Sequence, residues 1–203
     1  MKTILGVAIV SAALMGAGAP TACSAEITGG VGAGLAVPVS DLSDPFDPGF
    51  KLTGWVSGRM RGPFAWRGEV GYDRMRLAGD LRSACRAARL KCEVHMDVAY
   101  VASGLQLGGE RKRDVAPYGY VTLGLYHVGG GATVTNPRDR DSVISGSAAE
   151  NDFGIAAGLG VRLRLGASWG VAAEGRYAGF TFGLGDFTWG SLVTATAHTW
   201  IRF

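Results

Sequence analysis

Residues 153–165 alternate between two chemically different sets of side chains, and this alternation constrains the fold more than any other feature. The odd positions are Phe153, Ile155, Ala157, Leu159, Val161, Leu163 and Leu165, and the even positions are Gly154, Ala156, Gly158, Gly160, Arg162 and Arg164. Strict alternation indicates a β-strand with two opposite faces. A water-facing strand surface is usually Thr, Lys, Glu or Ser, because Gly weakens a strand and packs nothing. Tiny residues followed by two arginines therefore suit the crowded lumen of a narrow barrel whose apolar face contacts lipid.

The start of the chain, residues 1–25, has the organisation of a secretory signal peptide. A lysine supplies the charged start, residues 4–15 are mostly apolar, and small residues follow them. This stretch is too short for a membrane-anchoring helix, which needs about 20 apolar residues. We therefore expect cleavage after Ala25, which leaves residues 26–203 as one domain; attachment of lipid to Cys23 is the alternative.

Eight segments of the mature chain show two-faced alternation. In the third, Phe64, Trp66 and Val70 share one face, and Arg67 and Glu69 share the other. The connections alternate between long and short, as in an antiparallel barrel with short periplasmic turns and longer outer loops. An even number of strands then places both termini on the periplasmic side. The segments are residues 27–37, 49–61, 64–77, 93–107, 116–128, 152–165, 169–182 and 190–203.

Two of the long connections carry further information. Removal of the signal peptide leaves Cys85 and Cys92, both at residues 78–92, where the sequence predicts a polar outer loop. In an oxidising compartment we expect them to form a disulfide, with two free thiols or a metal pair as the alternatives. The longest connection, residues 129–151, is rich in Gly, Ser and Thr and is predicted to be a solvated loop.

The whole mature chain resembles the small eight-stranded outer-membrane β-barrel proteins of Gram-negative bacteria, the OmpA/OmpX-like group. The resemblance rests on the signal peptide, the eight segments, the long and short connections, and a final strand that ends in an aromatic residue. It implies an all-β fold, an eight-stranded antiparallel up-and-down transmembrane β-barrel in the bacterial outer membrane. A terminal aromatic preceded by alternating apolar residues resembles the signal read by the barrel-assembly machinery in this family. Phe203 and Ile201 are the expected residues of that signal.

Charged residues recur on the presumed inner faces of the strands. Charges in an apolar interior are costly unless they are paired, and here acids and bases occur together. An eight-stranded barrel has just enough interior to hold packed side chains, so we predict that paired charges plug the lumen. A narrow pore for ions or small solutes is the alternative. The predicted lumen charge network is Arg59, Arg67, Glu69, Asp73, Asp97, Arg162, Arg164, Glu174 and Arg176.

No catalytic or metal-binding motif is evident in the sequence. His198 has no serine within two positions, and His95 has Asp97 on its face of the strand without a nucleophile. The acidic residues at 41–47 lack the glycine and the distal glutamate of an EF-hand. We therefore expect no enzyme and no cofactor. The net charge of +3, without a basic patch, also argues against nucleic acid as a partner.

These observations favour an integral outer-membrane protein with a structural or surface-interaction role. The expected partners are outer-membrane lipid and lipopolysaccharide, the barrel-assembly machinery, and a surface partner that the sequence does not identify. A soluble periplasmic carrier of the lipocalin type is a further alternative. Such a carrier has an apolar lumen and a polar outside, the inverse of the pattern in residues 152–165 and 169–182.

Overall fold

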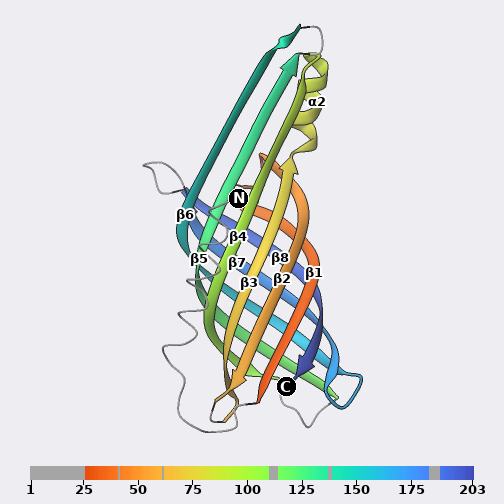
Figure 1. Ribbon diagram of the computed structural model, residues 1–203, viewed down its shortest axis with the longest axis vertical. Coiled ribbons are helices and arrows are strands. Elements are labelled where there is room, and N and C mark those ends of the chain that lie inside the picture. The colour runs from red at the N-terminus through yellow and green to blue at the C-terminus, as the bar shows by residue number, and fades with distance from the viewer. Residues whose placement is uncertain (1–25, 41, 61, 110–113, 137–138, 183–187) are drawn as a thin grey trace.

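In the computed structural model, eight antiparallel strands form a closed barrel, which confirms the predicted fold class (Figure 1). The structure describes residues 26–40, 42–60, 62–109, 114–136, 139–182 and 188–203, so the predicted signal peptide, residues 1–25, lies outside the described residues. No helix in these ranges has the length and apolar character needed to cross a membrane. The elements are β1 (Ile27–Ser40), β2 (Phe46–Arg59), β3 (Phe64–Leu77), α2 (Gly79–Ala87), β4 (Lys91–Gly108), β5 (Val115–Asn136), β6 (Asp139–Arg164), β7 (Trp169–Phe182) and β8 (Thr188–Arg202).

The two ends of the barrel differ in shape (Figure 1). At one end, the terminal end, β1 begins, β8 ends, and the connections from β2 to β3, β4 to β5 and β6 to β7 are made. At the other end, the loop end, β4, β5 and β6 rise beyond the remaining strands. β3 pairs with β4 only as far as His95, and β7 pairs with β6 only as far as Gly154. We call the projecting parts, residues 91–94, 127–136 and 139–153, the extension.

The extension corrects the prediction of a long outer loop at residues 129–151. β5 and β6 stay paired from Val115↔Leu163 to Asn136↔Asp139, so most of the predicted loop is antiparallel strand. The Gly-rich and Ser-rich composition suggested a loop because these residues contribute little packing to a strand. Hydrogen bonding between the two arms satisfies the backbone groups, and that pairing does not depend on large side chains. The second predicted loop, residues 78–92, also contains a regular element, the helix α2.

The outward faces of the strands carry large apolar side chains. Leu159 is 75% exposed and Phe153 is 78% exposed. A monomeric soluble protein rarely shows so continuous an apolar surface. A transmembrane barrel requires one, because its outer wall contacts lipid hydrocarbon. Other exposed members of this surface are Val31, Leu35, Leu52, Leu105, Val121, Leu123 and Ile155.

The small inward-facing residues of β6 make room for tyrosines of β5. Tyr118 lies opposite Gly160, and Tyr120 lies opposite Gly158. A Cβ atom at either glycine would meet the ring of its tyrosine at less than van der Waals distance. The glycine run that first suggested a crowded lumen is therefore the counterpart of an aromatic row on the neighbouring strand.

Because the Leu159 side chain points outward near the middle of β6, Leu159→Arg should destabilise the barrel in lipid by about 2–4 kcal/mol. Gly175 is its partner on β7, and a Cβ there would meet nothing within 4 Å. Gly175→Val should therefore be tolerated, and it serves as the control. The free energy of unfolding, measured in lipid vesicles by denaturant titration, checks both. Equal stability of the two variants would contradict a lipid-facing outer wall.

Candidate functional site

An ion pair between opposite walls of the barrel lies at the centre of the lumen. Arg67 on β3 is 0% exposed, and its Nη2 donates a hydrogen bond to Oε2 of Glu174 on β7 at 2.7 Å. Its Nε donates to Oε1 of Glu69, two residues along the same strand, also at 2.7 Å. One guanidinium thus contacts two carboxylates, and it ties β3 to a strand that it does not pair with in the sheet.

Tyrosines of β5 complete the hydrogen bonding of Glu174. Tyr118 donates to Oε2 at 2.9 Å, and Tyr120 donates to Oε1 at 2.6 Å. The guanidinium of Arg67 lies over the Tyr120 ring, 3.9 Å from its centroid. Charge-assisted hydrogen bonds and cation–π contacts are strongest where water is excluded, so this arrangement suits a buried carboxylate.

Arg176 continues the network from Glu69 toward the loop end. Its Nε lies 3.6 Å from Oε2 of Glu69, and its Nη2 donates to the hydroxyl of Tyr126 at 2.7 Å. Its guanidinium also lies 4.4 Å from the centroid of the Tyr100 ring. Tyr126 and Tyr100 thus extend the network beyond Arg176.

A second buried ion pair joins β2 to β3. Lys51 Nζ lies 3.1 Å from Oδ1 of Asp73, which is directly opposite it in the register of the two strands. The same ammonium donates to the hydroxyl of Tyr100 at 2.8 Å. Both ion pairs are therefore linked to the tyrosines of β4 and β5.

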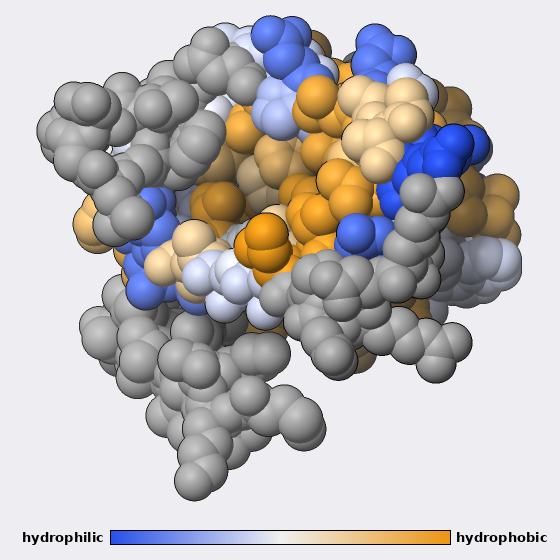
Figure 2. Space-filling view, turned by 90° about the horizontal axis from the view of Figure 1, so that it is seen from above, coloured by the Kyte–Doolittle hydropathy of each residue, from blue (hydrophilic) through white to orange (hydrophobic). Residues whose placement is uncertain are grey.

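The lumen nearer the loop end is filled by apolar side chains, which the sequence did not predict. Tyr126 stacks between Tyr100 and Phe180, with ring centroids 5.4 Å and 5.2 Å apart. Leu42, in the connection from β1 to β2, is buried against this group and closes it from the loop end. Figure 2, which views the molecule from above, shows hydrophobic residues within the barrel mouth. The other members of this apolar stopper are Met75, Met96, Val98, Ala102, Ala156, Ala178 and Leu192.

The structure distributes the predicted charge network over three places. Arg59 and Arg164 lie at the rim of the terminal end, where Arg164 Nη2 donates to Asp114 Oδ1 at 2.9 Å, and Asp97 lies on the outer wall. The six predicted residues that are buried in the lumen are Arg67, Glu69, Asp73, Arg162, Glu174 and Arg176.

The assignment of Asp97 to the lumen is wrong. Asp97 is directly opposite Arg74, and on the outer wall it accepts a hydrogen bond from Tyr72 at 2.6 Å. The error arose because β4 was expected to be polar inside and apolar outside along its whole length. Its inward residues here, Met96 and Val98, belong to the apolar stopper instead. The outward acid accordingly belongs to the polar rim above the lipid-facing surface.

Two members of the network were missed. Lys51 was not included among the predicted network charges. Counting back from the predicted turn at residues 62–63 pairs Lys51 with Arg74, whereas in the structure Met60 N–H donates to the carbonyl of Phe64 and the register shifts by one residue, to Asp73. The role of Gln106, which accepts a hydrogen bond from Arg162 Nη2 at 3.0 Å, had no local signal. That contact depends on two strands, β4 and β6, that are not neighbours in the sheet.

The extension presents a different kind of surface at the loop end. A disulfide between Cys85 and Cys92 attaches α2 to the start of β4, so one edge of the extension carries a helix (Figure 1). The opposite edge is β6, and no described strand pairs with it between residues 139 and 153 on the side away from β5. Ile144 on this stretch is 74% exposed. No charged residue or proline lies between Ile144 and Ala149.

α2, the residues that follow it and the start of β4 also contribute basic groups to the loop end. Arg82, Arg86, Arg89 and Lys91 line an open pocket of about 560 Å³ beside the disulfide. Arg82 forms an ion pair with Asp47. Lys91 donates to Glu93 at 2.7 Å, and this hydrogen bond lowers the pKa of the Glu93 carboxyl.

The predicted assembly-signal residues lie at the end of the last strand. Ile201 points outward on β8, and the backbone N–H of Phe203 donates to the carbonyl of Ile27 at 2.9 Å. Phe203 is therefore held beside the start of β1, with its ring exposed. Their role in assembly stays a prediction.

The chain was compared with known families and structures. The model of the outer membrane protein beta-barrel domain matches residues 9–198. Neisserial surface protein A is 15% identical with a TM-score of 0.52, over 87% of this chain and 97% of that one. A major outer membrane protein from Thermus thermophilus is 12% identical with a TM-score of 0.56, over 89% and 100%. Ail, the attachment invasion locus protein of Yersinia pestis, solved with the heparin analogue sucrose octasulfate, is 17% identical with a TM-score of 0.49, over 89% and 100%.

No curated protein matches this chain. At these sequence identities, the two structures with TM-scores above 0.5 establish a shared fold and nothing about ligands. The family model covers most of the chain, so it carries the assignment of the family.

Because Glu174 accepts hydrogen bonds from Arg67, Tyr118 and Tyr120, Glu174→Gln should leave a buried arginine short of its counter-charge. We expect a loss of about 3–5 kcal/mol in the free energy of unfolding. Glu93→Gln removes an exposed carboxylate from the same kind of pair and should change stability little, so it is the matched control. Denaturant titration in lipid vesicles compares the two. A near-neutral effect of Glu174→Gln would indicate a wet lumen.

Proposed function

Because this chain belongs to the outer membrane protein beta-barrel domain family, we propose that it is a sealed outer-membrane anchor that presents the extension at the cell surface. The terminal end, with its short turns, faces the periplasm in this proposal, and the extension faces outward. Short turns on the periplasmic side and longer excursions outside are the general pattern of such barrels. The role is one of interaction and not of catalysis, and the comparisons indicate no enzymatic family.

The open edge of β6 carries the proposal of a surface role. A strand at the edge of a sheet offers a row of backbone N–H and C=O groups that another extended chain can pair with. Most proteins protect such edges with charges, prolines, bulges or a covering element, and here α2 covers the opposite edge. The stretch from Ile144 to Ala149 has neither charge nor proline, and its side chains are small except for Ile144. We assign it the pairing of an extended peptide segment from a partner.

The lumen serves as the rigid support of this surface. The buried charged residues around Arg67 and Glu174, which we call the charged layer, and the apolar stopper together fill the lumen with ion pairs, rings and aliphatic side chains. An eight-stranded barrel encloses little more than the volume of its own side chains. A sealed, cross-braced barrel holds the bases of β4, β5 and β6 in fixed positions, and it therefore fixes the orientation of the extension.

Lipopolysaccharide is the lipid partner that we propose for the loop end. The pocket beside α2 carries four basic residues, and guanidinium groups match the geometry of phosphate oxygens. In the proposed orientation this pocket lies on the side of the outer leaflet. The phosphate groups of lipopolysaccharide supply the anionic chemistry that these side chains favour.

If the lumen is sealed, the wild-type protein in a planar lipid bilayer should give no steady single-channel current at moderate voltage. A double substitution that opens both layers, Arg67→Ala with Phe180→Ala, should create measurable conductance, provided that the protein still folds. Before each recording, the difference in gel migration between unheated and heated samples shows whether the protein is folded. Stable unitary steps from the wild-type protein would favour a pore.

Pairing along β6 can be tested with proline, which removes a backbone donor. Successive residues of a strand direct their N–H groups to opposite sides, so of Ala148 and Ala149 one faces β5 and the other faces the open edge. In nanodiscs, peptides selected from a displayed library against the wild-type protein should lose binding to both proline variants. The extension should stay intact, by hydrogen exchange, only in the edge-facing variant. Full binding to that variant would refute pairing at this edge.

A further inference from the structure

The buried charges of the lumen do not balance. Among the described residues, four cations are buried, Lys51, Arg67, Arg162 and Arg176, against three carboxylates, Glu69, Asp73 and Glu174. All three carboxylates form ion pairs with Lys51, Arg67 or Arg176. The remaining cation is Arg162, which lies closest to the terminal end.

Among the described residues, Arg162 is buried without an anionic partner within ion-pair distance. Its side chain is 8% exposed, and within the described part of the chain no carboxylate lies within 4.0 Å of it. Its Nη2 donates to the side-chain amide Oε1 of Gln106, and its guanidinium carbon lies 4.4 Å and 4.7 Å from the ring centroids of Trp55 and Tyr118. Its Nε has no hydrogen-bond partner among the residues that the structure describes. A buried, uncompensated charge is one of the costliest features that a protein interior can contain.

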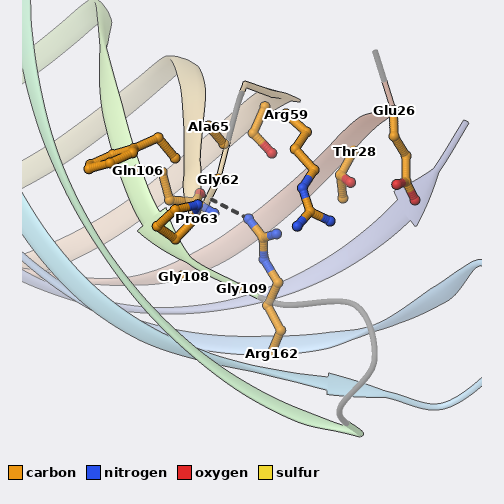
Figure 3. Close-up of a pocket in the computed structure, with 12 residues that line it drawn as sticks. Glu26, Thr28, Arg59, Gly62, Pro63, Ala65, Gln106, Gly108, Gly109 and Arg162 are labelled. Carbon is orange, nitrogen blue, oxygen red and sulfur yellow. Dashed lines mark hydrogen bonds between the residues drawn. The ribbon is translucent and has the colours of Figure 1, made fainter. Parts of the chain in front are cut away.

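A pocket at the terminal end lies directly against this arginine. It has a volume of about 50 Å³, and Arg59 and Arg162 line it together with the hydroxyl-bearing Thr28 and Ser57. Figure 3 shows the guanidinium groups of Arg59 and Arg162 extending into the same space from different strands. Glu26 also lines the pocket, but its Oε1 lies 3.5 Å from Nε of Arg202, which is its counter-ion.

The dimensions and chemistry of the pocket define what it can hold. A water molecule requires about 10–15 Å³ of such space, so this pocket has room for a group of several atoms. Two guanidinium groups and two hydroxyl groups supply hydrogen-bond donors, and guanidinium groups bind tetrahedral and planar oxyanions in a bidentate manner. The pocket opens at the rim of the terminal end, where solutes have access.

We propose that this pocket is a binding site for a small inorganic oxyanion of phosphate size, held between Arg162 and Arg59. The anion supplies the counter-charge that the described residues do not provide, and it closes the terminal end of the lumen electrostatically. Binding to the folded barrel alone makes stability depend on anion concentration. The site is independent of the extension and of its partner.

Inorganic phosphate is the probe. Purified protein in lipid nanodiscs should show a thermal unfolding midpoint that rises with phosphate concentration and saturates, at an ionic strength held constant with sodium chloride. Calorimetric titration should give one site per chain. An equal rise in a separate titration with sodium chloride alone, over the same range of anion concentration, would overturn the oxyanion assignment, and the absence of any rise with phosphate would overturn the site.

Three variants locate the effect. Arg162→Gln should abolish phosphate binding. Arg59→Gln, at an exposed position where folding is not at risk, should raise the dissociation constant for phosphate about tenfold or more, as expected for loss of one charge-assisted contact. Arg164→Gln, at the same rim but paired with Asp114, should retain wild-type affinity. Unchanged binding in Arg59→Gln would contradict the proposal even if Arg162→Gln failed to fold.

A last variant addresses a counter-charge from the chain itself. Glu110 follows the pocket-lining Gly109 in sequence and lies outside the described residues. If the oxyanion is the counter-charge, Glu110→Gln should bind phosphate as the wild type does. If phosphate binds only to Glu110→Gln, the carboxylate of Glu110 holds the site and the proposal is wrong.

Discussion

The rest of the barrel depends on the neutralisation of one buried carboxylate. Glu174 accepts hydrogen bonds from Arg67, Tyr118 and Tyr120, which belong to two strands other than its own. A carboxylate without such partners would be too costly to bury in a membrane-spanning protein. The small inward residues of β6 follow from this need, because the two tyrosines reach Glu174 across Gly158 and Gly160.

The cost of burying an unpaired charge also explains why the lumen has two layers. Charged groups gather where arginines and tyrosines from several strands can reach each carboxylate. Nearer the loop end, beyond the hydroxyl groups of Tyr100 and Tyr126, apolar side chains such as Phe180 and Leu192 fill the space. Packing thus fills one part of the lumen and ion pairing fills the other, and the surface role that we propose belongs to the parts that project beyond the barrel.

Much of the fold could be predicted from the sequence. The eight segments, the alternation of their faces and the cysteine pair of the second outer connection all have local signals. The two errors have different causes. Asp97 was placed inside because one rule was assumed to hold along the whole length of β4, and residues 129–151 were predicted to be a loop because of their Gly-rich and Ser-rich composition. β4, β5 and β6 pass from lumen to stopper to extension, so the environment of their faces changes along the way.

The sequence by itself determined which side chains share a face, because the period of a strand is two. Only the tertiary structure decided which charges meet across the barrel. Arg67 and Glu174 lie on strands that are not neighbours, and their contact depends on barrel closure and strand tilt, which no local pattern encodes. The same holds for Arg162, which lies on the predicted face but is left without a carboxylate among the described residues, because closure brings all three buried acids to other cations.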